Sequence, residues 1–169
     1  PAFLLGQQSD SLDAAKHFAR FEQMVEQEKY DEAFQSLDLA LASYKKADLL
    51  GNWLYAQIQK GKLMATARNQ PFEALQYLDG CTARDMWRAP KNRSEHIEHC
   101  YFYLDKSYIA KQYTEDFVLT KIALEKAYDI FHRDLGAEYV RIAEYMYFQL
   151  ANAYIRLREY KSATRIFEE

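Results

Sequence analysis

Apolar residues recur at intervals of three and four along most of the chain, which is the period of one face of an α-helix. The spacing is clearest in two stretches: Phe117, Thr120, Leu124, Ala127 and Phe131, and later Tyr147, Leu150, Ala151, Tyr154 and Leu157. Over the whole sequence the pattern predicts eight helices, at about residues 11–27, 30–47, 50–67, 71–84, 94–111, 114–134, 137–156 and 160–169. Five glycines and three prolines are too few for a fold of many short strands. We therefore expect an all-α protein.

The predicted helices repeat in pairs. The segments Glu28–Ala33 and Arg158–Ala163 share one order: a charged turn, a tyrosine, two polar residues and an alanine. The corresponding small positions are Ala33, Ala74, Thr120 and Ala163, which lie 41, 46 and 43 residues apart. This spacing predicts four hairpin units, at about residues 11–49, 50–93, 94–136 and 137–169. One hairpin cannot bury its apolar face alone, so neighbouring hairpins are expected to stack.

The two ends carry separate expectations. Residues 1–10 begin with an apolar stretch, which fits either a loose N-terminal arm or the remnant of a signal peptide. The last predicted helix has no stop signal, so the repeats are expected to continue past Glu169. Two cysteines exclude a disulfide framework but allow a single bridge. Localisation therefore stays open between the cytoplasm and an exported or periplasmic site.

Composition limits the classes of partner. Hydrophobic residues make up 49% of the chain and charged residues 28%, which is enough to bury a core. The net charge is −3 and no long basic run is present, so we expect neither nucleic acid nor an anionic membrane surface as a general partner. No stretch reaches the roughly 18 apolar residues of a membrane span, so we expect no membrane insertion.

The repeat resembles the tetratricopeptide repeat (TPR) family. The residues that match its pattern best are Tyr147, Leu150, Ala151, Tyr154, Tyr160, Ala163 and Phe167, followed by Tyr30, Ala33, Leu37 and Ala40 in the first unit. The first unit departs from the pattern at Arg20, the second is degenerate, and the third carries about three extra residues near 112–116. The long spacing is similar to that of kinesin light chain and of bacterial signalling proteins. The resemblance implies a right-handed α-solenoid of about four antiparallel helical hairpins.

The same resemblance implies a concave groove lined by the first helix of each hairpin. The residues that would face this groove are Phe18, Glu22, His99, Phe102, Lys106, Tyr145, Phe148, Asn152 and Arg156. Aromatic rings, an amide and a few charges suit an extended peptide. In the alternative interpretation, some of these rings pack against a following helix. The groove favours a non-enzymatic module that binds a peptide or protein segment, within a larger bacterial signalling or regulatory protein.

Two alternatives concern the context of such a module. It could instead be the sensory or autoinhibitory arm of an effector, such as a caspase-like protease, a histidine kinase or a peptide-responsive regulator. The open edge of the last helix could also support self-association. Both alternatives keep a protein or peptide as the partner.

One short segment is strongly basic and forms a secondary candidate. Arg84, Trp87, Arg88 and Arg93 lie within ten residues whose net charge is +3. An exposed tryptophan beside arginines could dock an acidic or aromatic segment of a partner. The alternative, which we favour, is a solvated connection whose tryptophan packs into the core.

Catalytic and metal-binding patterns are weak. The sequence has no GxSxG, HExxH, phosphate-binding glycine loop or dinucleotide fingerprint, so we expect no enzyme activity and no cofactor. His96, His99 and Cys100, here called the His/Cys set, have a spacing that could direct them toward one metal ion. A structural zinc site needs four ligands, and no compact second cluster is evident. We therefore predict a small core cysteine flanked by histidines, without metal.

Overall fold

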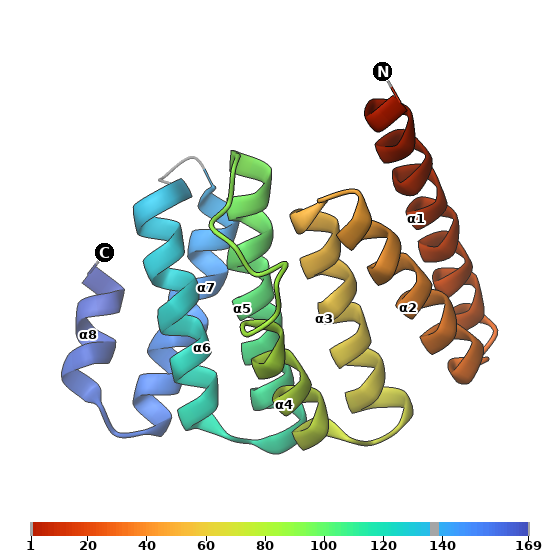
Figure 1. Cartoon of the computed structure of the whole chain (residues 1–169). Helices are drawn as coiled ribbons and strands as arrows, with labels where there is room; N and C mark the ends of the chain where they lie inside the picture. Colours follow the sequence, from red (N-terminus) through yellow and green to blue (C-terminus); the bar gives the residue numbers. More distant parts are fainter. Residues whose placement is uncertain (1, 136–138, 169) are drawn as a thin grey trace. The chain divides into compact units, whose positions relative to one another are not determined.

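The computed structural model describes residues 2–135 and 139–168, with side chains described from residue 10 onward. These residues are almost all helical and contain no strand, which confirms the all-α prediction. The helices are α1 (Ala2–Glu26), α2 (Tyr30–Lys46), α3 (Leu50–Ala67), α4 (Pro71–Cys81), α5 (Arg93–Thr114), α6 (Phe117–Ile130), α7 (Val140–Arg156) and α8 (Tyr160–Glu168) (Figure 1). A π-helical turn, η1 (Phe131–Leu135), extends α6.

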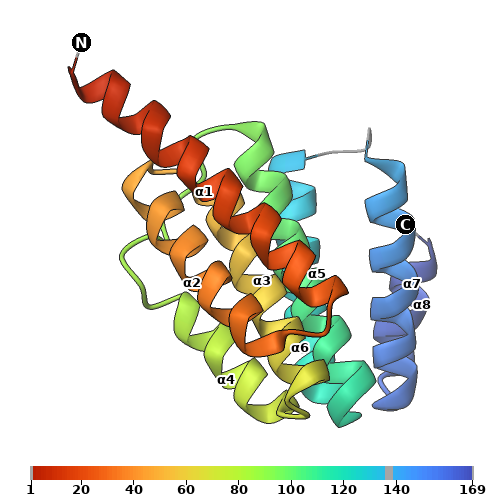
Figure 2. The ribbon, with the colours of Figure 1, turned by 90° about the vertical axis from the view of Figure 1, so that its right-hand side faces the viewer.

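Consecutive helices pack within two compact units, whose boundary in the sequence is the Ala89–Pro90 bond. The first unit holds the hairpins α1–α2 and α3–α4, and α2 packs against α3 (Figures 1 and 2). The second unit holds α5–α6 and α7–α8, with α6 packed against α7. Each unit is therefore a pair of helical hairpins stacked in sequence order, as in a hairpin solenoid.

Five connections between helices share one feature, a residue in the left-handed region of backbone conformation. Two positions before the next helix, a residue other than glycine has φ between 52° and 61°: Glu28, Asp48, Asn69, Glu115 and Arg158. After Glu28, the Lys29 amide donates to the Met24 carbonyl at 2.9 Å, which satisfies a carbonyl at the end of α1. The Leu49 and Glu159 amides make the same bond, to Tyr44 and Tyr154. In the other two connections, the Gln70 and Asp116 amides donate one residue further back, to Met64 and Ala110.

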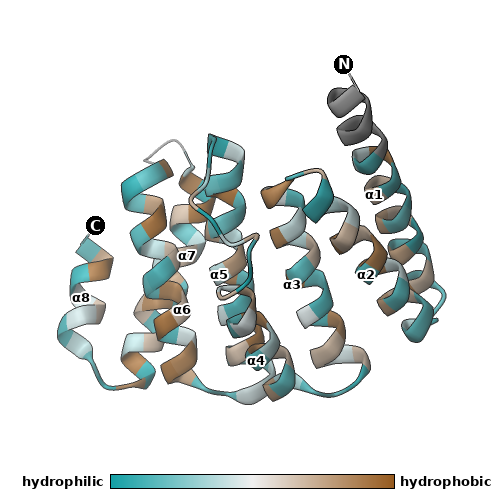
Figure 3. Ribbon diagram, viewed as in Figure 1, coloured by the Kyte–Doolittle hydropathy of each residue, from teal (hydrophilic) through white to brown (hydrophobic). Residues whose placement is uncertain are grey.

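Small side chains allow the paired helices to approach closely. The four repeat positions, Ala33, Ala74, Thr120 and Ala163, are at most 4% exposed. On α3, Gly61 is buried against α4: a Cβ atom at this position would lie 3.0 Å from Leu78 Cδ1. Figure 3 shows apolar and polar residues alternating along α2–α8, as expected when each helix buries one side.

Several helix ends differ from the predictions. α1 begins at Ala2 and continues through Ser9–Ser11, although these polar residues resemble a start signal near residue 11. α4 ends at Cys81, three residues earlier than predicted. The predicted start of the seventh helix at residue 137 lies outside the described residues. No described helix has the length and apolar content needed to cross a lipid bilayer.

Candidate functional site

The residues predicted to line the groove lie in both units. In the first unit, Phe18 and Glu22 are on α1. The Phe18 ring is half-buried and lies 5.2 Å from the Phe21 ring and 5.5 Å from the Tyr55 ring, between centroids. Glu22 is exposed. Phe18 is therefore packed against neighbouring rings, as the alternative interpretation expects, and only part of it is accessible.

The three predicted residues on α5 are buried. His99 and Lys106 are each 8% exposed and Phe102 is 1% exposed. Because these residues are three and four positions apart, they lie along one side of α5. A second row of buried residues on α5 includes Cys100 and Leu104. α5 is thus buried on two sides, which corrects the prediction that His99, Phe102 and Lys106 face an open groove. We exclude these three side chains from the accessible site.

The predicted residues on α7 lie on an accessible side of that helix. Tyr145 is 43% exposed and Phe148 is 59% exposed. Arg156 is exposed and Asn152 is half-buried. Steps of three and four residues place all four on one helical face. These four residues of the predicted groove therefore share one accessible face of α7.

Exposed tyrosines of α5, which the sequence analysis did not select, extend this surface. Tyr101 and Tyr108 are 43% and 42% exposed, and the Tyr108 ring lies 6.2 Å from that of Tyr113. Burial, and then the charge of Asp105 and the proximity of Tyr108, raise the pKa of Tyr145, so the side chains of α5 and α7 lie close together. We call this surface the aromatic face; its members are Tyr101, Tyr108, Tyr113, Tyr145 and Phe148.

A small cationic pocket lies among α5, α6 and α7. Its volume is about 240 Å³, and its lining residues are Lys111, Phe117, Thr120, Gln149, Asn152, Ala153 and Arg156. Lys111 donates to the Gln149 side-chain oxygen at 2.8 Å, which links α5 to α7. The Arg156 guanidinium lies 5.5 Å from the centre of the Phe117 ring. Two cations and two amides without an acid among these lining residues suit an anionic oxygen of a ligand.

The arginines of the basic segment contact other residues of their own units. Arg88 pairs with Asp48 at 3.2 Å, and Arg93 lies over the Tyr139 ring at 5.0 Å. Arg88 belongs to the first unit and Arg93 to the second. Trp87 is half-buried. Arg88 and Arg93 thus have intramolecular partners, which favours the structural alternative. Arg84 also has partners within the chain, and these belong to a different feature.

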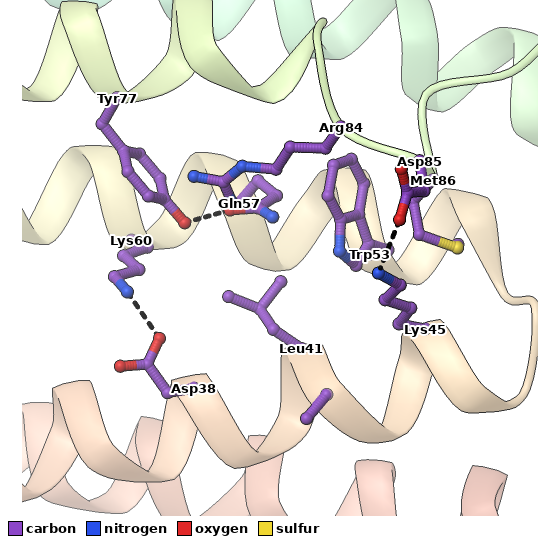
Figure 4. Close-up of a pocket in the computed structure, with 11 residues that line it drawn as sticks. Asp38, Leu41, Lys45, Trp53, Gln57, Lys60, Tyr77, Arg84, Asp85 and Met86 are labelled. Atoms are coloured by element: carbon purple, nitrogen blue, oxygen red, sulfur yellow. Dashed lines mark hydrogen bonds and ion pairs between the residues drawn. The ribbon is translucent and has the colours of Figure 1, made fainter.

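That feature is a larger pocket within the first unit, here called the α2–α4 pocket (Figure 4). Its volume is about 450 Å³, and its lining residues are Asp38, Leu41, Ala42, Lys45, Trp53, Gln57, Lys60, Tyr77, Arg84, Asp85 and Met86. At its centre Gln57 is 1% exposed. In the orientation that satisfies its neighbours, the Gln57 oxygen accepts from Arg84 at 2.9 Å and from the Trp53 indole at 3.3 Å, and its nitrogen donates to Tyr77.

The Tyr77 hydroxyl is held in its neutral form by this environment. Burial raises the pKa of Tyr77, and the nearby Arg84 only partly opposes the shift. No local sequence pattern marks this pocket, because its residues come from three helices and one connection, over almost fifty positions. Of its members, only Arg84 was selected as a candidate.

The His/Cys set does not converge on one point. His96 Nδ1 lies 3.2 Å from a carboxylate oxygen of Asp134, whereas the Cys100 thiol points to the Ala127 carbonyl at 3.6 Å. Burial raises the pKa of Cys100 to about 12, which disfavours the thiolate that a metal would need. Among the residues that the structure describes, no group of three potential metal ligands is found.

Comparison with known proteins adds no assignment. No model of a protein family matches the sequence, and no curated protein is significantly similar to it.

Proposed function

We propose that this chain is a non-enzymatic, TPR-like module that binds a segment of a partner protein on the second unit. The observation that carries the proposal is the aromatic face: five rings, each more than a third exposed, on two neighbouring helices. Exposed rings of this kind supply large contact areas at low entropic cost, and they are enriched at the centres of interfaces.

The cationic pocket supports the same proposal and narrows the ligand. Asn152 and Arg156 belong to the pocket and follow Phe148 on the same face of α7. A segment with an apolar side chain on Phe148 could place an acidic group near Lys111 and Arg156. The expected partner segment is therefore apolar with at least one carboxylate.

Two features support membership in a TPR-like family. The small repeat positions are buried, and five residues with positive φ precede helices at the same offset. Both features recur from hairpin to hairpin, as a repeat requires.

The test is selection of peptides from a displayed random library with the full chain as bait. Affinities of the selected peptides are then measured for two double variants. Tyr145→Ala with Phe148→Ala truncates the aromatic face, and the matched control Val118→Ala with Ile122→Ala truncates exposed apolar residues of α6. We expect the first variant to weaken binding about tenfold or more, because interface rings often contribute over 1 kcal/mol each.

The control variant should bind as the unmodified chain does. Arg156→Glu should add a loss that shrinks at high salt, because screening weakens the attraction between Arg156 and an acidic ligand. The proposal fails if no peptide sequence is enriched, or if all variants bind the selected peptides equally while remaining folded.

A further inference from the structure

The α2–α4 pocket has a charge balance that points to a ligand. Two ion pairs occupy it: Lys60 lies 2.5 Å from Asp38, and Lys45 lies 3.2 Å from Asp85. Arg84 is the third cation of the lining, and no carboxylate pairs with it among the residues that the structure describes. The pocket therefore carries one uncompensated positive charge.

The Arg84 side chain is positioned rather than loose. Its guanidinium lies 4.8 Å from the centre of the Tyr77 ring and donates one N–H group to Gln57. Figure 4 shows it extending between Tyr77 and Trp53, from the connection that follows α4. A guanidinium has five N–H groups in a planar fork, so donors remain that can bind a carboxylate through both of its oxygens.

The pocket that contains Arg84 is also lined by apolar residues. Leu41 and Ala42 come from α2, Trp53 from α3 and Met86 from the connection after α4. A volume of about 450 Å³ lies within the range of sites for small organic molecules, which combine apolar walls with a few orienting polar groups. The pocket thus offers one charged contact and an apolar space next to it.

We propose that the α2–α4 pocket binds a small organic monocarboxylate, with its carboxylate on Arg84 and its apolar body against Trp53 and Leu41. One negative charge neutralises the pocket, whereas a phosphate dianion would leave it negative in total. Lys45 and Lys60 each pair with an acid of this chain, so Arg84 is the cation of the pocket that has no carboxylate partner among the described residues. The proposal uses no residue of the aromatic face and stands independently of the proposed function.

The test is an NMR titration of the full, ¹⁵N-labelled chain, followed at the indole N–H of Trp53. The chain has two tryptophans, so Trp87→Phe assigns the two indole signals. The probes are phenylacetate and indole-3-acetate, with phenylacetamide as the uncharged match and inorganic phosphate as the competing anion. The variants are Arg84→Gln, Arg84→Lys and the control Arg20→Gln, which removes the same charge from an exposed site on α1.

We expect both acids to shift the Trp53 signal in a saturable manner and phenylacetamide to leave it unchanged. Arg84→Gln should raise the dissociation constant about tenfold or more, as loss of a charged hydrogen bond does. Arg84→Lys keeps the positive charge but loses the planar guanidinium, so it should weaken binding less than Arg84→Gln does. If Arg84→Gln does not fold, Arg84→Lys serves as the test variant. Arg20→Gln should bind as the unmodified chain does.

Four results would overturn the proposal. They are no saturable shift with either acid at millimolar concentration, equal binding of phenylacetamide, unchanged binding by the folded Arg84 variants, and tighter binding of phosphate than of both acids. The last result would reassign the pocket to a phosphate group.

Discussion

Two glycines of the first unit provide a matched test of how closely its second hairpin is packed. Gly61 lies within α3, and a Cβ atom there would meet three side-chain atoms of Leu78 at 3.0, 3.1 and 3.2 Å. Leu78 is fully buried, so it has little room to move. Gly80 lies near the end of α4, where a Cβ atom would meet nothing within 4 Å. Each glycine can be changed to alanine, the smallest side chain.

Both changes gain the helix propensity of alanine, but only the change at position 61 adds an atom against Leu78. Alanine favours a helix over glycine by about 0.8–1 kcal/mol in the interior of a helix, and by less near its end. Gly80→Ala should therefore stabilise the chain by about 0.5–1 kcal/mol. At Gly61 the same gain is opposed by overpacking against Leu78, which costs about 1–3 kcal/mol. We expect Gly61→Ala to be about 1–3 kcal/mol less stable than Gly80→Ala.

The assay is urea unfolding followed by far-ultraviolet circular dichroism. Because both variants lie in the same hairpin, the difference between their midpoints reports the contact at position 61. If Gly61→Ala is as stable as Gly80→Ala, the contact between position 61 and Leu78 is not close enough to resist an added methyl group.

Three further predictions concern other features. Ala33→Trp and Ala163→Trp should each cost about 1–3 kcal/mol or more, because both positions are buried at helix contacts; unchanged urea midpoints in both would contradict this. The hydrogen bond from Arg133, with the charge of His96, lowers the pKa of the Asp134 carboxyl group in the folded chain. Asp134 therefore stabilises the fold at pH values above the pKa that it has in the unfolded chain, and this contribution is lost as the pH falls through the lowered pKa. In Asp134→Asn, the free energy of unfolding should therefore fall less steeply as the pH is lowered, and an unchanged acid dependence would contradict this prediction. Finally, EDTA should leave the melting temperature unchanged, whereas a clear drop would revive a metal at the His/Cys set.

Much of the fold follows from local patterns in the sequence. The three-and-four spacing of apolar residues predicts helices, and the positions of Ala33, Ala74, Thr120 and Ala163 predict how they pair. The turns are less predictable than the helices. Glycine is the usual sequence signal for a residue with left-handed backbone conformation, whereas these turns use other residues, such as Glu28 and Arg158. Their strain is offset by the helix-closing hydrogen bonds, which are not visible in the sequence.

The candidate sites were only partly predictable, and α5 shows why. The buried residues of α5 include the polar residues Glu95, His99, Lys106 and Ser107. A search for apolar periodicity would assign such positions to the surface. Tyr101 and Tyr108, in contrast, look like core residues and are exposed. On α7 the amphipathic pattern is clean, and there the resemblance selected accessible residues. The α2–α4 pocket depends on convergence of residues far apart in the sequence, which no local pattern records.

The two cysteines allow the stability of each unit to be followed separately. Cys81 lies in the first unit and Cys100 in the second, and both are completely buried. The pKa of Cys100 is raised to about 12 by burial, so its thiol has almost no reactive thiolate while the native packing persists. Alkylation of either thiol should therefore require opening of the unit that holds it.

A destabilising change in one unit should then act mainly on the cysteine of that unit. Ala33→Trp lies in the first unit, and a loss of 1–2 kcal/mol would raise the population of its open form about 5- to 30-fold. We expect iodoacetamide to label Cys81 faster by a similar factor and Cys100 much less, because stacked hairpins are stabilised chiefly by their own packing and that of their neighbours. Mass spectrometry of the two cysteine peptides measures both rates in one sample, and Ala163→Trp should reverse the preference. Equal acceleration of both cysteines by either variant would show that the chain opens as a single cooperative body, contrary to a stack of separately packed units.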